Sequence, residues 1–376
     1  NLLPCFGATV SDQMLAAELY DYRPRFPIGR LAASSPEEVK IYLEKVQAHE
    51  ATSSLPQTIE DKAWMKEVLH FGGGSDIIEQ QQFESYLNQY RDMIQDTSFG
   101  GHVTTFLKNS SNPIQIAYSH LFDSLFNRGV SIMNFFGHSS TNSFDFSVDV
   151  PENYTNVGKY PLVISNGCYS GNMYTSGLTM SKRFVIQEDK GSIGFLAAAG
   201  LSYSAYDHIY TYSFLEHFSY KSYGESVGSL IKKSIHELYD TTDMFLRYTC
   251  QTFNLHGEPL VNLNSPSLPD YAIDENQVQF NPSYVTVNED SFEMHLEVFN
   301  LGKAIHDSFL VRVERTFPDG TIDVSYEEMH KAPLYKDTFI IQIATNPEMA
   351  LGINGLKVEI DPTDQAPSLQ VDELDN

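Results

Sequence analysis

The chain has 376 residues, 41% of them hydrophobic, and its 24 lysines and arginines against 49 aspartates and glutamates give a formal net charge of −25. This charge argues against a protein that binds nucleic acid or anionic membranes, because both functions need clustered cations. No apolar run reaches the roughly 18–20 residues of a membrane span. The 22 tyrosines and 24 phenylalanines supply enough buriable surface to exclude a disordered chain.

The first 130 residues alternate between helical and strand patterns. Residues 36–50 show apolar side chains at helical spacing after a Ser-Ser-Pro start that suits an N-cap and a first turn. A strand-like stretch at 64–71 stops at three glycines. The patterns that follow predict a helix over 83–94, a short strand over 102–108 and an amphipathic helix over 113–129.

Three nearly continuous apolar runs follow, at 130–136, 160–165 and 192–199. Such runs are typical of strands buried on both faces. Helical patterns near 207–219 and 224–239 come next. Because strands alternate with helices, we predict an α/β fold with a mostly parallel sheet and helices on both faces.

The segment 263–270 contains two prolines and marks a change of pattern and charge, so we predict a linker there. Residues 270–376 carry 21 acidic and 6 basic side chains, and their apolar positions alternate with a period of two. This pattern favours a β-sandwich. The predicted domains are 1–265 and 270–376, and the predicted strands of the second are 278–287, 291–300, 309–317, 337–345 and 355–361.

The three cysteines, Cys5, Cys168 and Cys250, are too few for a disulfide framework. The first residues read as the interior of a folded domain and the last ones as a strand cut short. We therefore expect the chain to be a piece of a longer protein, with its N-terminal part and its final strand truncated.

Two residues with reactive side chains directly follow buried strands. His138 comes after the strand at 130–136, and Cys168 comes after the strand at 160–165. In open parallel sheets ligands bind beyond the carboxyl ends of the strands. If these two strands are neighbours, the imidazole and the thiol converge as a nucleophile–base pair.

The small residues around this pair suit an oxyanion hole, which needs accessible backbone N–H donors. We predict that the amides of Ser139 and Cys168 serve as those donors. The alternative is that Cys168 is a small buried apolar residue and His138 a surface group. Spacing alone leaves both interpretations open.

Several segments resemble the gingipain-type cysteine peptidases. Residues 11–50 are similar to that family's stretch SDxx…xIGRxxxxxxEE, and FFGHSS at 135–140 resembles its catalytic-histidine motif. YPLVISNGCYSGN at 160–172 is similar to the strand that leads to its nucleophilic cysteine, and NLHGEPLVNL at 254–263 resembles the close of its catalytic domain. The match runs in order from about residue 8 to residue 263.

The resemblance implies a caspase-like fold and thiol endopeptidase activity, with Cys168 as nucleophile and His138 as general base and acid. The chain looks closest to the sortase-like members of the type IX secretion system. Ser139 stands where the family has a glycine. In the family, a glutamate before a glycine pair orients the catalytic histidine. Here His70 or Phe71 occupies that place, before Gly72 and Gly73, so the glutamate is absent.

We therefore keep His70 as a possible orienting residue. Asp76 falls where gingipains carry an acidic residue of the specificity pocket, although an acid at a helix N-terminus explains it as well. Residues 200–206, after the next buried strand, are expected to line that pocket.

The C-terminal segment contains VQFNPSYVTV at 278–287, LEVFNLGKAIHDSFLVRV at 296–313 and VEIDPTDQAPSLQVDELDN at 358–376. This order of sequences resembles adhesion-type immunoglobulin-like modules. The resemblance as a whole implies an exported protein at the bacterial cell surface, associated with the outer membrane or extracellular. It also implies that the protein acts on protein or peptide substrates. Secretion-machinery proteins are further candidate partners. No cofactor is required by this chemistry. Structural calcium is suggested by the family, although no acidic loop has recognisable ligand spacing. The alternative function is a catalytically weak or inactive peptidase-fold binding protein.

Overall fold

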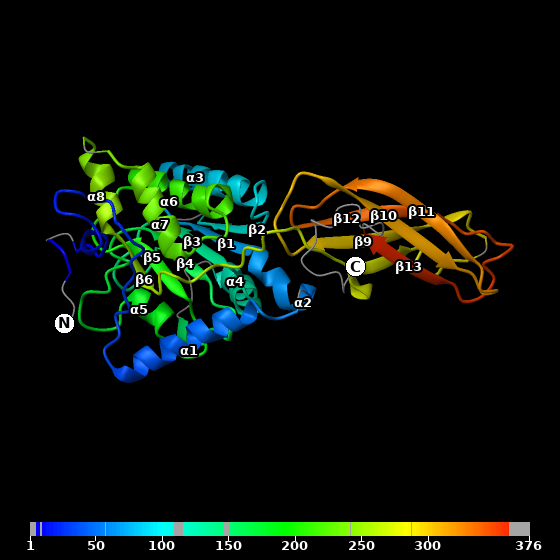
Figure 1. Ribbon diagram of the computed structural model, residues 1–376, viewed down its shortest axis with the longest axis horizontal. Helices are drawn as coiled ribbons and strands as arrows, with labels where there is room; N and C mark the ends of the chain where they lie inside the picture. The colour runs from blue at the N-terminus through cyan, green and yellow to red at the C-terminus, as the bar shows by residue number, and fades with distance from the viewer. Residues whose placement is uncertain are drawn as a thin grey trace. The chain divides into compact units, whose positions relative to one another are not determined.

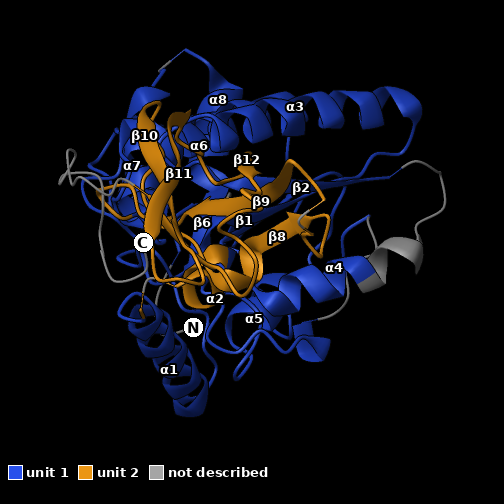
Figure 2. Cartoon of the chain, turned by 90° about the vertical axis from the view of Figure 1, so that its right-hand side faces the viewer, with its two compact units in different colours: residues 1–55, 64–265 blue, residues 56–63, 266–376 orange. Residues whose placement is uncertain are grey.

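The computed structural model describes residues 5–7, 10–56, 58–108, 116–145, 151–240, 242–286 and 288–360. The chain divides into two compact units, coloured separately in Figure 2. The first contains Asn1–Leu55 and Trp64–Ser265, and the second contains Pro56–Ala63 and Pro266–Asn376. The short segment that the second unit takes from the N-terminal half was not predicted.

The first unit is built on a six-stranded sheet with the strand order β2-β1-β3-β4-β5-β6. The first five strands run parallel and β6 runs antiparallel to β5. The predicted mostly parallel sheet is therefore confirmed. Its strands are β1 (Glu67–Gly72), β2 (His102–Leu107), β3 (Ile132–Phe136), β4 (Leu162–Asn166), β5 (Gly194–Ala198) and β6 (Phe253–Gly257).

Helices cover both faces of this sheet (Figure 1). One core cluster joins the sheet to helices α3, α6, α7 and α8, and a second joins it to α1, α4 and α5. Every residue of β3, β4 and β5 is buried, which explains their continuous apolar sequences. The helices are α1 (Pro36–Thr52), α3 (Ile77–Gln95), α4 (Ile116–Arg128), α5 (Met180–Val185), α6 (Ser204–Glu216), α7 (Val227–Glu237) and α8 (Met244–Thr252).

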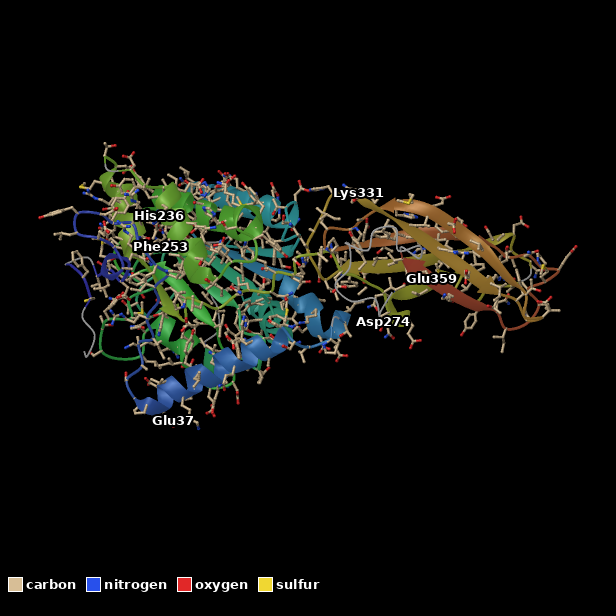
Figure 3. All side chains as sticks on the ribbon, viewed as in Figure 1. Glu37, His236, Phe253, Asp274, Lys331 and Glu359 are labelled. Carbon is tan, nitrogen blue, oxygen red and sulfur yellow. The ribbon has the colours of Figure 1, made fainter. Side chains whose placement is uncertain are left out.

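Helix α1 begins as its sequence predicts. The Ser35 side chain accepts a hydrogen bond from the Glu38 amide, and Pro36 occupies the first turn. Glu37 lies at the exposed start of this helix, whereas Phe253 is buried in the interior of the unit (Figure 3).

None of the helices in the described ranges is long and apolar enough to cross a membrane.

The second unit consists of two antiparallel sheets around their own apolar core. One sheet has the order β11-β10-β13; in the other, β9 pairs with β12, β7 and β8. Ile59 and Ala63 from the short N-terminal segment, which includes α2 (Ile59–Lys62), pack on a satellite cluster of this unit. The strands are β7 (Tyr271–Ala272), β8 (Val278–Asn281), β9 (Ser291–Asn300), β10 (Ser308–Thr316), β11 (Ile322–Lys331), β12 (Lys336–Ala344) and β13 (Gly355–Ile360).

Candidate active site

The candidate site lies at the carboxyl edge of the parallel sheet. The chain passes from β1 outward to β2 and then returns to the other side of β1 as β3, so the topology reverses between β1 and β3. Ligands of open α/β sheets bind at such a reversal. The segments that leave β1, β3, β4 and β5 at this edge carry every group described below.

His138 and Cys168 occupy equivalent places on neighbouring strands. Phe136 of β3 pairs with Asn166 of β4, and each reactive residue follows its strand by two positions. The loops also touch, because the Ser139 hydroxyl donates a 2.8 Å hydrogen bond to the carbonyl oxygen of Cys168. A Cβ atom at Gly167 would lie 2.4 Å from the Ser139 Oγ. The loop that holds the thiol therefore requires glycine at this position.

The imidazole of His138 has a carboxylate partner that the sequence analysis did not identify. Its Nε2 lies 2.9 Å from Oε2 of Glu79, in the first turn of α3. The hydrogen bonds from His138 and from the Ser75 amide lower the pKa of Glu79, so this carboxylate stays ionised and accepts the Nε2 proton. Nδ1 is then the ring nitrogen that is free to take a proton.

The structure places His70 in the core of the first unit and Asp76 at the start of α3. His70 is fully buried on β1, with its ring edge-on to Tyr90, and the position beside the His138 imidazole belongs to Glu79 instead. Asp76 is the N-cap of α3 and accepts hydrogen bonds from the amides of Ile78 and Glu79. Asp76 therefore fixes the helix turn that carries Glu79, and its place in a specificity pocket stays a prediction.

The Cys168 sulfur contacts the segment after β5. The Ser202 amide donates to the sulfur over 3.4 Å. Tyr169, which follows the cysteine, adopts a left-handed conformation with φ of 59° and donates its amide to the Gly200 carbonyl at 2.8 Å. This strained turn holds the half-buried cysteine against residues 200–202, inside the range expected to line the substrate pocket.

The buried carboxyl group of Asp207 holds Ser202, the residue whose amide contacts the Cys168 sulfur. The Ser202 hydroxyl donates a hydrogen bond to Oδ2 of Asp207 in α6. Burial raises the pKa of Asp207 to about 7. No sequence motif distinguishes this aspartate from a solvated residue at the start of a helix.

The two amides predicted to form an oxyanion hole are available. Within the described ranges, neither the Ser139 amide nor the Cys168 amide donates to another protein group. Paired loops with free N–H groups are what a developing oxyanion requires. Their use in catalysis stays a prediction.

A metal site has less support. In the part of the chain that the structure describes, no three His, Cys, Asp or Glu side chains gather in a way that could hold a metal ion. The calcium suggested by the family resemblance stays a prediction, and we derive no step through a metal.

A mostly parallel caspase-like sheet with a thiol and an imidazole at its carboxyl edge is the arrangement expected of a cysteine-peptidase fold. The sequence model described as peptidase family C25 matches residues 1–264. The chain therefore belongs to peptidase family C25.

Curated relatives in that family include Lys-gingipain HG66 of Porphyromonas gingivalis, 26% identical over 246 residues, and Lys-gingipain W83 of the same species, 24% identical over 243 residues. Each match covers 63% of this chain and 13% of the relative, so the chain spans about an eighth of their length.

Two solved structures support the fold. The Arg-specific cysteine proteinase gingipain R is 14% identical, with a TM-score of 0.55, and the match covers 93% of this chain and 78% of that one. A second structure, described as a protease, is 18% identical with a TM-score of 0.57, and covers 89% and 78% of the two chains. Both matches extend beyond the first unit.

We predict that Glu79→Gln lowers kcat for peptide cleavage by about 10–100-fold with little change in KM, because the amide no longer selects the imidazole tautomer with Nδ1 free. Steady-state kinetics checks this. Glu84→Gln, on the same helix, is the matched control. An unchanged kcat in Glu79→Gln would show that this carboxylate does not position the imidazole.

Asp207 predicts a pH dependence of stability. In the unfolded chain its carboxyl titrates near 3.8, so between about pH 4 and pH 7 only the folded chain keeps this proton, and stability falls as pH rises. Asp207→Asn should abolish this fall in the free energy of unfolding, which amounts to at most roughly 4 kcal/mol in the wild type. Chemical unfolding across this pH range measures it, with the exposed Glu44→Gln as control. Parallel curves for the wild type and Asp207→Asn would contradict the buried-acid interpretation.

Proposed function

We propose that the chain cleaves or transfers peptide bonds through a thioester on Cys168, with His138 as general base and acid. The observation that carries this proposal is the hydrogen bond between Glu79 and His138, because it leaves one ring nitrogen free at the edge where the thiol lies. This arrangement has the logic of a catalytic triad, in which a carboxylate orients the base and the base serves the nucleophile.

The proposed reaction has two stages. His138 Nδ1 takes the proton from the Cys168 thiol, and the sulfur attacks the scissile carbonyl carbon. The amides of Ser139 and Cys168 hold the negatively charged oxygen of the tetrahedral intermediate. When the C–N bond breaks, the proton on Nδ1 passes to the departing amine and the acyl group remains on sulfur as a thioester.

The acyl-enzyme then reacts with a second nucleophile. Water attacks the thioester carbon and gives a proton to Nδ1. The C–S bond then breaks, the carboxylic acid leaves, and Nδ1 returns the proton to the Cys168 sulfur, which completes hydrolysis. Attack by the amine of another molecule completes transpeptidation, as the resemblance to sortase-like members suggests. The two outcomes use the same residues up to the thioester and differ only in what reaches it.

The binding-protein alternative was motivated by the missing glutamate. Glu79 supplies a carboxylate from a different position in the chain, so that motive is removed. Cys168 is half-buried rather than enclosed, which is compatible with access for a substrate. We therefore favour the peptidase over the inactive binding protein.

We further propose that the substrates are proteins or peptides and that the protein works after export, at the cell surface or outside the cell. The family membership supports the substrate class. The sequence resemblance of residues 270–376 to adhesion-type immunoglobulin-like modules supports the location, and the two-sheet architecture of the second unit is compatible with such a module. Secretion-machinery partners belong to this same proposal.

A peptidyl electrophile tests the proposed nucleophile. We expect a peptidyl acyloxymethyl ketone to label Cys168 alone in the Cys5→Ser variant, because Cys250 is fully buried and burial raises the pKa of its thiol to about 12. Mass spectrometry locates the label. Cleavage of a peptide library should be retained in Cys5→Ser, lost in Cys168→Ala and reduced about 100-fold or more in His138→Ala.

The proposal fails if Cys250 of the Cys5→Ser variant is modified while Cys168 stays intact, or if Cys168→Ala cleaves peptides as fast as the wild type. Addition of an amine acceptor during turnover separates the two outcomes of the acyl-enzyme. A ligated product indicates transpeptidation, and hydrolysed product alone indicates a peptidase.

A further inference from the structure

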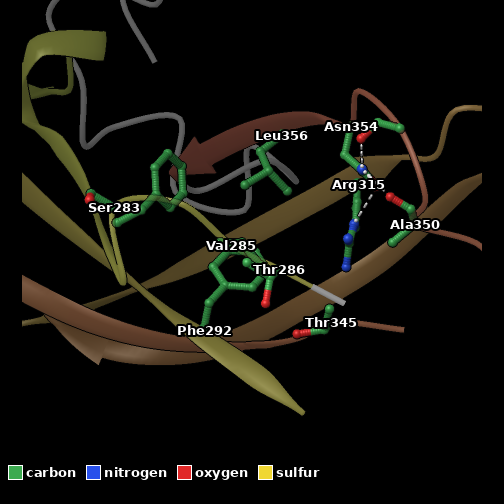
Figure 4. A pocket seen from close by; sticks show the side chains of 11 residues that line it. Ser283, Val285, Thr286, Phe292, Arg315, Thr345, Ala350, Asn354 and Leu356 are labelled. Atoms are coloured by element: carbon green, nitrogen blue, oxygen red, sulfur yellow. Dashed lines mark hydrogen bonds between the residues drawn. The ribbon is translucent and has the colours of Figure 1, made fainter. Parts of the chain in front are cut away.

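The second unit contains a pocket of about 230 Å³, remote in sequence from the catalytic residues. Figure 4 shows its lining side chains, which come from β8, β9, β10, β13 and the segments next to strands of this unit. Pockets for drug-sized ligands measure about 300–1,000 Å³, so this one suits a smaller molecule or a single side chain. Its walls combine apolar groups, among them Phe292, Val285 and Leu356, with the cation of Arg315.

Arg315 is a buried cation. It lies on β10 with 4% of its surface exposed, and burial lowers its pKa. Nε donates to Oδ1 of Asn354 at 3.0 Å, and Nη1 donates to the Ala344 carbonyl at 2.7 Å. These two bonds hold the guanidinium at the pocket wall, where its Nη2 group has no hydrogen-bond partner in the described ranges.

The charge of Arg315 is not balanced by a carboxylate. Within the described part of the chain no Asp or Glu oxygen lies within 4.0 Å of it, although residues 270–376 carry 21 acidic side chains. The neighbouring Arg312, on the same strand, pairs with Glu314 and Glu327. The guanidinium lies over the Phe317 ring, with Cζ 4.8 Å from its centroid, but an aromatic face does not neutralise a full positive charge, so this buried cation favours an anion as its partner.

A second polar group of the same pocket also lacks a partner. Thr345 is 2% exposed, and its hydroxyl oxygen is buried without a hydrogen bond in the described ranges. Buried hydroxyl groups are normally satisfied. The pocket thus presents one cation, one unsatisfied hydroxyl and an aromatic wall.

We propose that this pocket binds a carboxylate attached to an apolar group, with Arg315 as its counter-charge. The planar guanidinium matches a carboxylate through two parallel hydrogen bonds. One positive charge balances a monoanion, and Phe280 and Phe292 provide the surface for its hydrocarbon part. The carboxylate comes either from a small free acid or from the C-terminus of a polypeptide. This proposal is independent of the peptidase activity.

Isothermal titration of the whole chain with 3-phenylpropionate, and with its uncharged amide as the matched probe, tests the proposal. We expect saturable binding of the acid and at least tenfold weaker binding of the amide. Comparing the dipeptide Gly-Phe with Gly-Phe amide shows whether a polypeptide terminus is accepted as well. Binding of the free acid alone assigns the site to small acids.

Two variants locate the binding. Arg315→Lys should abolish it, because a single ammonium cannot make the paired contact, whereas Arg312→Lys on the same strand should leave it unchanged. Arg315 also bonds to Asn354 and Ala344, so its replacement can disturb the fold; Thr345→Val, which keeps the shape, should then weaken binding several-fold. Equal affinity for acid and amide, no saturation up to about 10 mM, or unchanged binding in both Arg315→Lys and Thr345→Val overturns the proposal.

Discussion

The in-register pairing of β1, β3, β4 and β5 is the constraint on which the candidate site depends. Parallel pairing brings the carboxyl ends of all four strands to one edge, so residues from positions 79 to 202 meet although they are far apart in the sequence. A slip of one residue between β3 and β4 would turn every side chain to the opposite face and separate His138 from Cys168. Continuous burial of these strands, with different apolar residues packed on the two faces, specifies the register.

Short polar contacts complete what the sheet begins. Asp76 caps α3, and the capped turn carries Glu79 to His138. The Ser139 hydroxyl links the histidine loop to the cysteine loop, and Ser202 connects the sulfur to Asp207. These contacts join segments that follow different strands, so several elements together hold the site in place.

Much of the fold and two of the three members of the proposed triad could be predicted from the sequence. The buried strands are apolar runs ending in glycine- and serine-rich turns, and that pattern pointed to His138 and Cys168. Glu79 could not be found in this way, because it lies in a helix rather than at a strand end. The available signal was the Asp76-x-x-Glu79 spacing of a capping box, which marks a helix start and carries no information about a distant histidine.

The sequence did not predict strand β11, the burial of Arg315 or the burial of Asp207, and each has a physical explanation. β11 is a largely exposed edge strand, so its sequence lacks the alternation that identified its neighbours. The pocket at Arg315 was equally invisible, since charged residues within strands usually face solvent and only the fold shows that this one is buried. Asp207 is likewise a charged residue type whose burial only the fold shows. Tertiary burial, rather than local sequence, creates each of these features.

The two units balance charge in different ways. The second carries the greater excess of acidic side chains and yet encloses a cation without a carboxylate partner in its described part. In the first unit, the described site holds a carboxylate from helix α3 together with an imidazole and a thiol from two connected loops. Catalysis and ligand binding would thus occupy separate compact units of one chain.

A crystal structure of the chain treated with a peptidyl aldehyde tests the central claim most directly, because the aldehyde carbon forms a reversible tetrahedral adduct with a thiol nucleophile. The account predicts a covalent bond to Cys168 Sγ, His138 Nδ1 within about 4 Å of that sulfur, and the adduct oxygen facing the amides of Ser139 and Cys168. A sulfur more than about 7 Å from both ring nitrogens, or an adduct on another residue, would contradict it.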